Sequence, residues 1–130
     1  MTFTNDMGAG PLRFAAESML PQLDAANYGA LDLLPFGVIR MTGDGIVVAY
    51  NECESRMAGL SLQSVLGRHF FTEIAPCTNN ALVAGRFKAE PTLDATIDYV
   101  FSLRLKPMPV RLRMLQGSES RFAYLLVAKR

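Results

Sequence analysis

Hydrophobic and polar positions alternate most clearly in the last third of the chain. From residue 95 to residue 106 the odd positions are apolar or aromatic and the even positions are polar, apart from Val100. A period of two is typical of a strand that buries one face, so a strand is predicted over 95–106. After a proline-containing turn, alternation predicts a strand over 110–114, and the run over 122–128 is interpreted as the last strand.

A hairpin is predicted between residues 36 and 51. Residues 36–41 form a β-branched and aromatic run, residues 46–51 form a second run, and Thr42-Gly43-Asp44-Gly45 lies between them. An Asp-Gly pair between two apolar runs is a strong hairpin signal, because these residues tolerate the backbone angles of a tight turn.

Between residues 52 and 88 the strand pattern is absent, and short helices fit the sequence better. Ser61 is a suitable N-cap because its hydroxyl can accept a backbone N–H. Gly59 and Gly67 are suitable helix ends because glycine tolerates the left-handed conformation. The four predicted helical segments are 52–58, 61–66, 70–74 and 81–88.

The N-terminal region, residues 14–34, is amphipathic but interrupted by Pro21 and Gly29, which favours one or two short helices packed on a larger body. Two strands, a helical middle and three strands follow one another along the chain. This order predicts an α+β fold, a five-stranded antiparallel sheet with short helices on one face. Residues 1–34 are predicted to be a cap segment and residues 35–130 the core of a single domain.

Basic side chains gather on one face of the predicted C-terminal strands. They are interpreted as a solvated face, covered in part by the N-terminal segment with Glu17, Asp24 and Asp32. A docking surface for a partner is the alternative. The four basic residues are Arg104, Lys106, Arg111 and Arg113.

Composition narrows the class of protein. The chain has 130 residues, half of them hydrophobic, which is enough for one domain with one core. Thirteen basic and twelve acidic residues give a net charge of +1, which argues against a general nucleic-acid binder. The sequence has no run approaching the roughly 18 apolar residues of a membrane span, no secretory-signal pattern and no disulfide framework. A cytoplasmic protein, monomeric or weakly dimeric, is expected.

Three side chains are candidates for chemistry. Cys77 follows Pro76, which fixes the backbone before the thiol, although most free cysteines are simply small buried hydrophobes. Tyr50 ends a predicted strand and Glu54 lies in the next helical turn, where a strand tyrosine and a solvated glutamate are the simplest interpretation. A phenol and a neutral carboxyl are each a single O–H donor, so together they could bind one anionic oxygen if burial kept the carboxyl protonated.

Motifs of enzymes and metal sites are absent from the sequence. His69 is the only histidine, there is no nucleophile elbow, and one histidine with two separated cysteines does not make a zinc site. The histidine is interpreted as a surface or helix-cap residue, and the chain is predicted not to be an enzyme. An acyl-transfer enzyme that uses Cys77 has the least support, because no histidine base is placed by a motif.

Three segments together resemble the photoactive yellow protein family: Tyr50-Asn51-Glu52-Cys53-Glu54, Gly67-Arg68-His69-Phe70-Phe71 and Ala75-Pro76-Cys77-Thr78. The resemblance extends over residues 14–129 and implies a PAS domain with an N-terminal helical cap. It also implies a blue-light photoreceptor whose 4-hydroxycinnamoyl chromophore, derived from p-coumaric acid, is linked to Cys77 as a thioester. Tyr50 and Glu54 would hold the phenolate of this chromophore.

The resemblance further implies how such a receptor signals. Trans-to-cis isomerisation would be followed by proton transfer from Glu54, by loosening of the N-terminal segment and by recognition by an unknown downstream signalling protein. The other positions that the resemblance places around the chromophore are Phe70, Thr78, Phe101 and Leu105.

Four positions depart from the family pattern. Ala58 and Leu60 stand where the family has a threonine and an arginine near the phenol. Leu103 and Leu105 stand where the family has a tyrosine and a methionine near the chromophore. These replacements leave a more apolar pocket and support an alternative, a PAS module that is not photochemical and binds a small apolar ligand or a partner protein.

Overall fold

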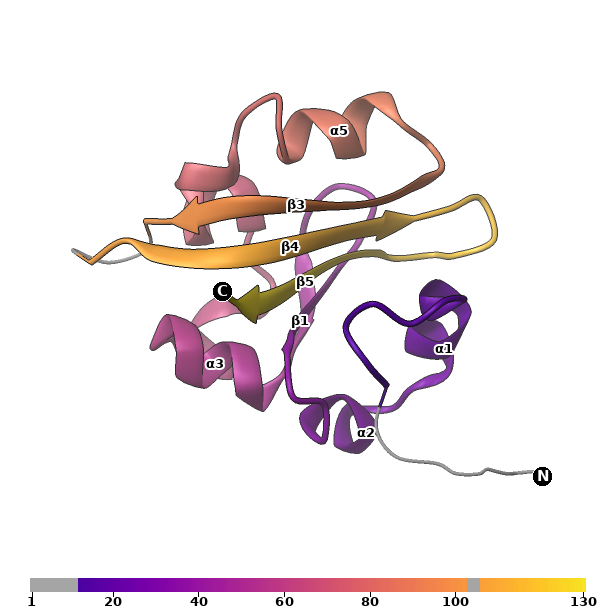
Figure 1. Cartoon of the computed structure of the whole chain (residues 1–130), viewed down its shortest axis with the longest axis horizontal. Helices are drawn as coiled ribbons and strands as arrows, with labels where there is room; N and C mark the ends of the chain where they lie inside the picture. Colours follow the sequence, from indigo (N-terminus) through magenta and orange to yellow (C-terminus); the bar gives the residue numbers. More distant parts are fainter. Residues whose placement is uncertain (1–11, 103–105) are drawn as a thin grey trace.

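The computed structural model describes residues 12–102 and 106–130; Leu103, Arg104 and Leu105 lie outside the described residues. Five antiparallel strands form one sheet in the order β2-β1-β5-β4-β3, as predicted for the fold class (Figure 1). The strands are β1 (Gly37–Met41), β2 (Val47–Tyr50), β3 (Leu93–Phe101), β4 (Met108–Gln116) and β5 (Ala123–Lys129). The helices are α1 (Met19–Ala25), α2 (Tyr28–Asp32), α3 (Glu52–Ala58), α4 (Leu62–Val65), the π-helical turn η1 (Phe70–Ile74), the 3-10 turn η2 (Pro76–Thr78) and α5 (Ala84–Ala89).

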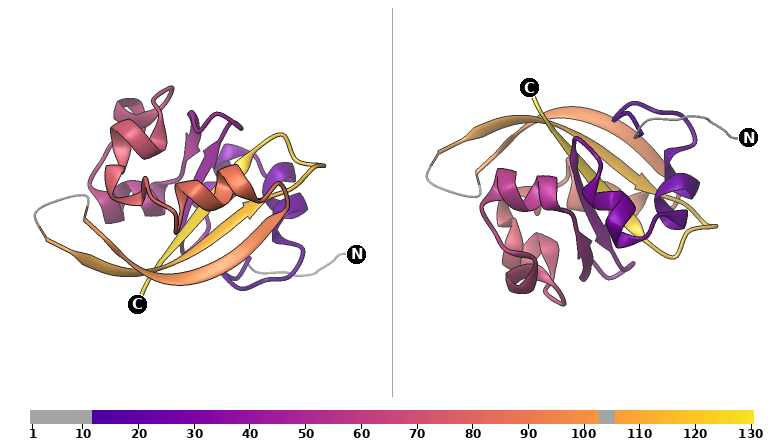
Figure 2. Two further views of the ribbon diagram at one scale, coloured as in Figure 1. Left: turned by 90° about the horizontal axis from the view of Figure 1, so that it is seen from above. Right: turned by 90° about the horizontal axis from the view of Figure 1, so that it is seen from below.

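The sheet separates two hydrophobic clusters. The helical middle of the chain, from α3 to α5, covers one side, called here the helix face, and the N-terminal segment with α1 and α2 covers the other, the cap face (Figure 2). Along β5 the two faces alternate, because Leu125 belongs to the cluster of the helix face while Tyr124 and Leu126 belong to that of the cap face. Short helices on one face and an N-terminal helical cap were both predicted.

Local signals in the sequence place the first turns and helix ends. The Thr42 hydroxyl accepts two backbone N–H groups of the hairpin turn at 3.2 and 3.3 Å. Gly45 has a φ of 87°, and a Cβ atom there would lie 2.9 Å from Nε2 of His69, which caps η1 as expected of this histidine. The helix α3 covers the predicted residues 52–58 and ends at Gly59, whose φ is 71°, and the Ser61 side chain caps α4.

Two predicted elements had a boundary wrong by three residues or more, and the strand predicted over 110–114 is β4, which is longer at both ends (Met108–Gln116). The helix expected over 81–88 begins at Ala84, because the Asn80 side chain accepts the N–H groups of Leu82 (2.9 Å) and Val83 (3.2 Å) and keeps residues 81–83 in a turn. The strand expected over 95–106 is β3, which starts earlier and ends at Phe101. Its last residue, Phe101, pairs with Met108, the first residue of β4.

The predicted solvated face of the C-terminal strands is only partly solvated. Arg111 is exposed and pairs with Asp98 at 3.1 Å, as expected. Arg113 is buried instead, and its guanidinium binds both carboxylate oxygens of Asp94, at 2.8 and 2.9 Å. Its Nη1 atom also donates to the backbone carbonyls of Phe14 (2.9 Å) and Ala16 (2.7 Å). The N-terminal segment therefore covers this arginine with carbonyl groups rather than with acidic side chains.

A second arginine, Arg40 of β1, binds the C-terminal end of α1 and so holds this helix on the sheet. Its Nη2 atom donates to the carbonyls of Leu23 (2.7 Å) and Ala26 (3.1 Å), and its Nε atom donates to Tyr124 Oη (2.9 Å). Tyr124 in turn donates to Asp24 at 2.6 Å. Asp24 thus helps to hold α1 on the sheet. The prediction that Asp24 covers the C-terminal arginines was wrong.

Candidate functional site

Tyr50 and Glu54 lie at the junction of β2 and α3, which a buried asparagine holds in place. Asn51 Oδ1 accepts the N–H groups of Glu54 (3.1 Å) and Val38 (2.9 Å), so one side chain caps α3 and joins it to β1. Its Nδ2 atom donates to the carbonyls of Leu31 (2.8 Å) and of Phe36 (3.0 Å). The sequence contained the Tyr-Asn pair, but the role of Asn51 as the centre of this junction was not predicted.

The Glu54 side chain occupies space that is left by Gly37 in β1. A Cβ atom at Gly37 would overlap Glu54 Oε1 and would lie 3.1 Å from Glu54 Cβ. Glu54 is 1% exposed, and this burial raises the pKa of its carboxyl to about 8, opposed in part by the neighbouring Tyr50 side chain. The carboxyl is therefore mostly protonated at neutral pH and can donate a hydrogen bond.

Tyr50 shares this environment. Its phenol is buried, and burial together with the nearby Glu54 raises its pKa well above the usual value, so the phenol keeps its proton. Neither Tyr50 Oη nor Glu54 Oε1 has a hydrogen-bond partner among the described residues. A buried polar atom without a partner costs roughly 1–3 kcal/mol, and native proteins pair most such atoms. Two neighbouring donors left without partners fit an anionic oxygen of a ligand.

Cys77 lies in η2, directly after η1, and is half-buried against the hydrophobic cluster of the helix face. Its carbonyl accepts hydrogen bonds from Tyr99 Oη (2.5 Å) and from Asn80 Nδ2 (3.1 Å). The Thr78 hydroxyl is buried and donates to the Ala75 carbonyl at 2.7 Å, which closes the turn around the cysteine. Hydrogen bonds from Tyr99, Asn80 and Thr78 thus fix the backbone that carries the thiol.

Two of these supporting residues were not predicted as parts of the site. Tyr99 was predicted as one of the alternating apolar or aromatic positions of a strand and as a position of the family scaffold, and Asn80 was not considered. Asn80 Nδ2 also donates to Tyr99 Oη at 2.7 Å, so the two side chains hold the Cys77 carbonyl together. The signal that could have found Asn80 is the Asn-Asn pair after Thr78, because asparagine side chains commonly organise turns.

The predicted aromatic walls lie in the same cluster as the polar residues. Phe70 and Phe101 are 1% and 2% exposed, and both belong to the cluster that contains Tyr50 and contacts Cys77. Ala58 is buried there as well. Tyr50, Phe70 and Phe101 thus share one cluster against which Cys77 packs, while Glu54 neighbours Tyr50 and Thr78 follows Cys77 in η2. The remaining predicted site position, Leu105, lies outside the described residues, as does Leu103.

Residues 12–102 and 106–130 contain no group of three or more histidine, cysteine, aspartate or glutamate side chains that could hold a metal ion. Within the same residues, no helix has the length and hydropathy needed to cross a membrane.

A five-stranded antiparallel sheet with short helices on one face, enclosing buried donors and a thiol, defines a sensory domain of the PAS type. Two relatives with similar sequences support this assignment. The photoactive yellow protein of Rhodothalassium salexigens is 39% identical over 106 residues, which cover 79% of this chain and 85% of that protein. The photoactive yellow protein of Halochromatium salexigens is 38% identical over 94 residues, covering 68% and 75%. The chain belongs to the photoactive yellow protein family.

Solved structures lead to the same assignment. The photoactive yellow protein domain of the sensor histidine kinase Ppr from Rhodospirillum centenum is 38% identical, with a TM-score of 0.76, and the match covers 84% of this chain and 98% of that domain. The PAS domain of a protein similar to HTR from Haloarcula marismortui, 18% identical with a TM-score of 0.59 and covering 88% and 98%, shares the fold. No protein-family model matches the chain.

Proposed function

We propose that this PAS-type photoreceptor senses blue light through a 4-hydroxycinnamoyl group held as a thioester on Cys77. The observation that carries the proposal is the pair of buried donors, Tyr50 Oη and Glu54 Oε1, which lack partners among the described residues. The half-buried Cys77 in the same cluster supplies the attachment atom. Membership of the photoactive yellow protein family supports this chemistry.

The bound group would supply a conjugated double bond that absorbs blue light and isomerises from trans to cis. The residues of the chain do the rest. Tyr50 and Glu54 each donate one hydrogen bond to the phenolate oxygen, and such charge-assisted bonds are short and strong. Phe70 and Phe101 exclude water from the thioester at Cys77 Sγ, since both are almost fully buried.

Glu54 holds the proton that moves during signalling. Once its carboxyl had passed this proton to the phenolate oxygen that it binds, a carboxylate would remain in a site where burial disfavours charge, which costs several kcal/mol unless a partner is found. The strain would be transmitted through α3 and Asn51, whose side chain holds the carbonyls of Leu31 and Phe36. The cap segment is therefore proposed to loosen in response.

The output is proposed to be recognition by a downstream signalling protein in the cytoplasm. One structural relative is a photoactive yellow protein domain of a sensor histidine kinase, which is an example of such a domain within a signalling protein. The curated relatives are named as photoactive yellow proteins and not as enzymes.

Reconstitution tests the proposal. The protein is treated with an activated ester of 4-hydroxycinnamic acid, and its visible spectrum and intact mass are recorded. We expect a visible absorption band and the mass of one acyl group, both lost in Cys77→Ser and both kept in Cys53→Ser. Colour retained in Cys77→Ser, with the label on the Cys53 peptide, would contradict the attachment site.

A second candidate function rests on the apolar replacements at Ala58 and Leu60, which both contact the cluster of the helix face. A PAS module of this kind would bind a small apolar ligand without photochemistry. A protein that takes up the acyl group but shows no light-induced loss and thermal return of its visible band would favour this alternative.

A further inference from the structure

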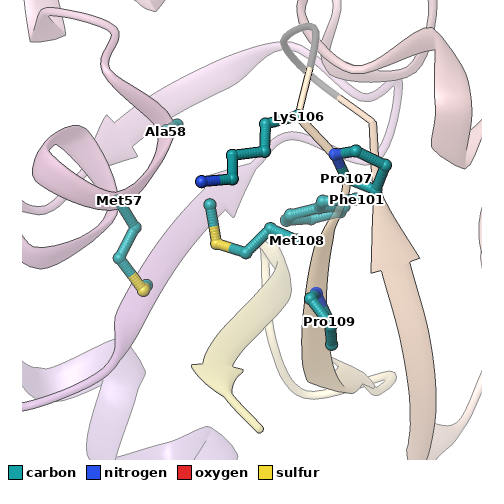
Figure 3. Close-up of a pocket in the computed structure, with 7 residues that line it drawn as sticks. All are labelled: Met57, Ala58, Phe101, Lys106, Pro107, Met108 and Pro109. Carbon is teal, nitrogen blue, oxygen red and sulfur yellow. The ribbon is translucent and has the colours of Figure 1, made fainter.

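A small pocket lies where β3, β4 and α3 meet. Its volume is about 270 Å³, and it is lined by Met57 and Ala58 of α3, by Phe101 of β3 and by residues 106–109 (Figure 3). The lining is apolar except for the side chain of Lys106, which extends across the pocket toward α3 (Figure 3). An apolar space with one cationic group suits a small aromatic anion.

The pocket adjoins the candidate site on two sides. On α3, Met57 and Ala58 follow Glu54 by three and four residues, so they lie on the same face of the helix, about one turn away. On β3, the Phe101 ring contacts the Tyr99 ring, with 6.3 Å between centroids, and Tyr99 holds the Cys77 carbonyl. The pocket therefore shares α3 with Glu54, and it shares β3 with Tyr99, which holds the Cys77 carbonyl.

Among the described residues of the candidate site, no titratable side chain supplies a positive charge. The titratable groups of this site are Tyr50 from β2, Glu54 from α3, Cys77 from η2 and Tyr99 from β3, and each of them is neutral when it carries its proton. A buried anion that faces only neutral donors is easier to protonate than one with a cation nearby. Arg56, also on α3, pairs with Glu52 at the exposed surface.

We propose that Lys106 is the counter-charge of the candidate site, so that the pocket prefers phenolates over neutral aromatic molecules. The ammonium on its flexible four-carbon stem can approach a phenolate bound in the pocket that it lines. The identity of the covalent ligand in this inference rests on the proposed function, while the preference for phenolates rests on the pocket alone.

The first test uses the protein without an acyl group. The dissociation constants of 3,4-dinitrophenolate, which is ionised at neutral pH, and of its neutral methyl ether are measured by calorimetry. Because solvent screens an exposed ammonium, Lys106→Met is expected to weaken binding of the phenolate about two- to fivefold. Binding of the ether should not change. Lys106→Arg should retain the preference, and Lys88→Met, which removes an exposed lysine of α5, should behave as the unaltered protein.

Loss of binding by the same factor for both probes, or for neither, overturns the proposal. If Lys106→Met does not fold, the same comparison is made with Lys106→Gln. The second test titrates the visible band of the acylated protein with acid, and Lys106→Met should bleach at a pH about half a unit to one unit higher. If no coloured adduct forms, the proposed function fails, and the dinitrophenolate comparison still decides the role of Lys106.

Discussion

The two faces of the sheet differ in whether their polar groups have hydrogen-bond partners within the chain. On the cap face, Arg40 and Arg113 donate to backbone carbonyls of the N-terminal segment, and Tyr124 links Arg40 to Asp24. On the helix face, Tyr50 Oη and Glu54 Oε1 are buried but have no hydrogen-bond partner among the described residues. Both sets of groups come from the same sheet and its adjoining elements.

The contrast separates a structural role from a binding role. Where the polar groups hold one segment of the chain on another, the chain supplies donor and acceptor itself. Where donors have no partner in the chain and are proposed to bind a ligand, the chain without that ligand retains the cost of the unpaired groups, roughly 1–3 kcal/mol for each. Stability measurements on the protein without a ligand can therefore test whether the polar groups of each face have a structural role or a binding role.

The largest expected effect is the pH dependence that Glu54 gives to stability. Its pKa is raised from 4.5 to about 8 in the folded chain, so between these values the unfolded chain binds fewer protons. The free energy of unfolding should therefore fall as pH rises from about 4.5 to about 8, by roughly 3–5 kcal/mol in total. Urea titrations across this range measure it.

Glu54→Gln should remove this slope, because a neutral amide does not titrate. Glu73→Gln is the control, since Glu73 is an exposed carboxyl whose pKa is lowered by Arg68. A slope that persists in Glu54→Gln at its original size would show that another group is responsible.

Breaking the cap face should have the next largest effect. Arg113→Met removes the contacts to Asp94 and to the carbonyls of Phe14 and Ala16, and the free energy of unfolding should fall by about 2–4 kcal/mol. Arg111→Met is a matched control two residues earlier on the same strand, because its pair with Asp98 is exposed and is worth about 0–1 kcal/mol. Equal losses of stability in the two variants would show that the contacts of Arg113 on the cap face stabilise the protein no more than the exposed ion pair of Arg111.

A smaller effect is expected when the space for Glu54 is filled. Gly37→Ala places a Cβ atom against the Glu54 carboxyl, and such overpacking should lower the free energy of unfolding by about 1–3 kcal/mol. Gly43→Ala is the control, because a Cβ atom there meets nothing within 4 Å. Thermal unfolding of both variants distinguishes them, and a neutral Gly37→Ala would mean that the carboxyl has room to move.

The smallest effect is the most direct comparison of the two faces. Tyr124→Phe removes a hydroxyl that binds Arg40 and Asp24, and the free energy of unfolding should fall by about 1–2 kcal/mol. Tyr50→Phe removes a buried hydroxyl without a partner, so stability of the unloaded protein should stay the same or rise by up to about 1 kcal/mol. Urea denaturation of the pair at pH 6 tests the sign, and a comparable loss in Tyr50→Phe would contradict the assignment of its hydroxyl to a ligand.

Much of the fold followed from local patterns in the sequence. The Asp-Gly turn, the Ser61 cap and the alternation along 95–101 depend on neighbouring residues alone, and the structure confirms them. Arg113 was predicted wrongly for the opposite reason. Period two gives the face of a strand on which a side chain lies, but it does not reveal that a segment almost 100 residues away covers that face.

The candidate site shows the same limit. Cys77, Tyr50 and Glu54 were found through a resemblance, because spacing alone favours an ordinary tyrosine and a solvated glutamate. The burial of Glu54 depends on Gly37 in another strand, and the position of the Cys77 carbonyl depends on Tyr99. These are long-range relations, which a single sequence does not display.

The pairing of β1 with β5 also determines when the protein can become functional. Residues 37–41 pair with residues 123–127, so the middle of the sheet is built from the two ends of the core. During synthesis, Tyr50, Glu54 and Cys77 leave the ribosome well before β5 is available. Contacts between distant segments form late, because a long loop must close first. The proposed acylation of Cys77 is therefore expected to follow the synthesis of β5, and a nascent chain that is stalled before β5 should not be competent for it.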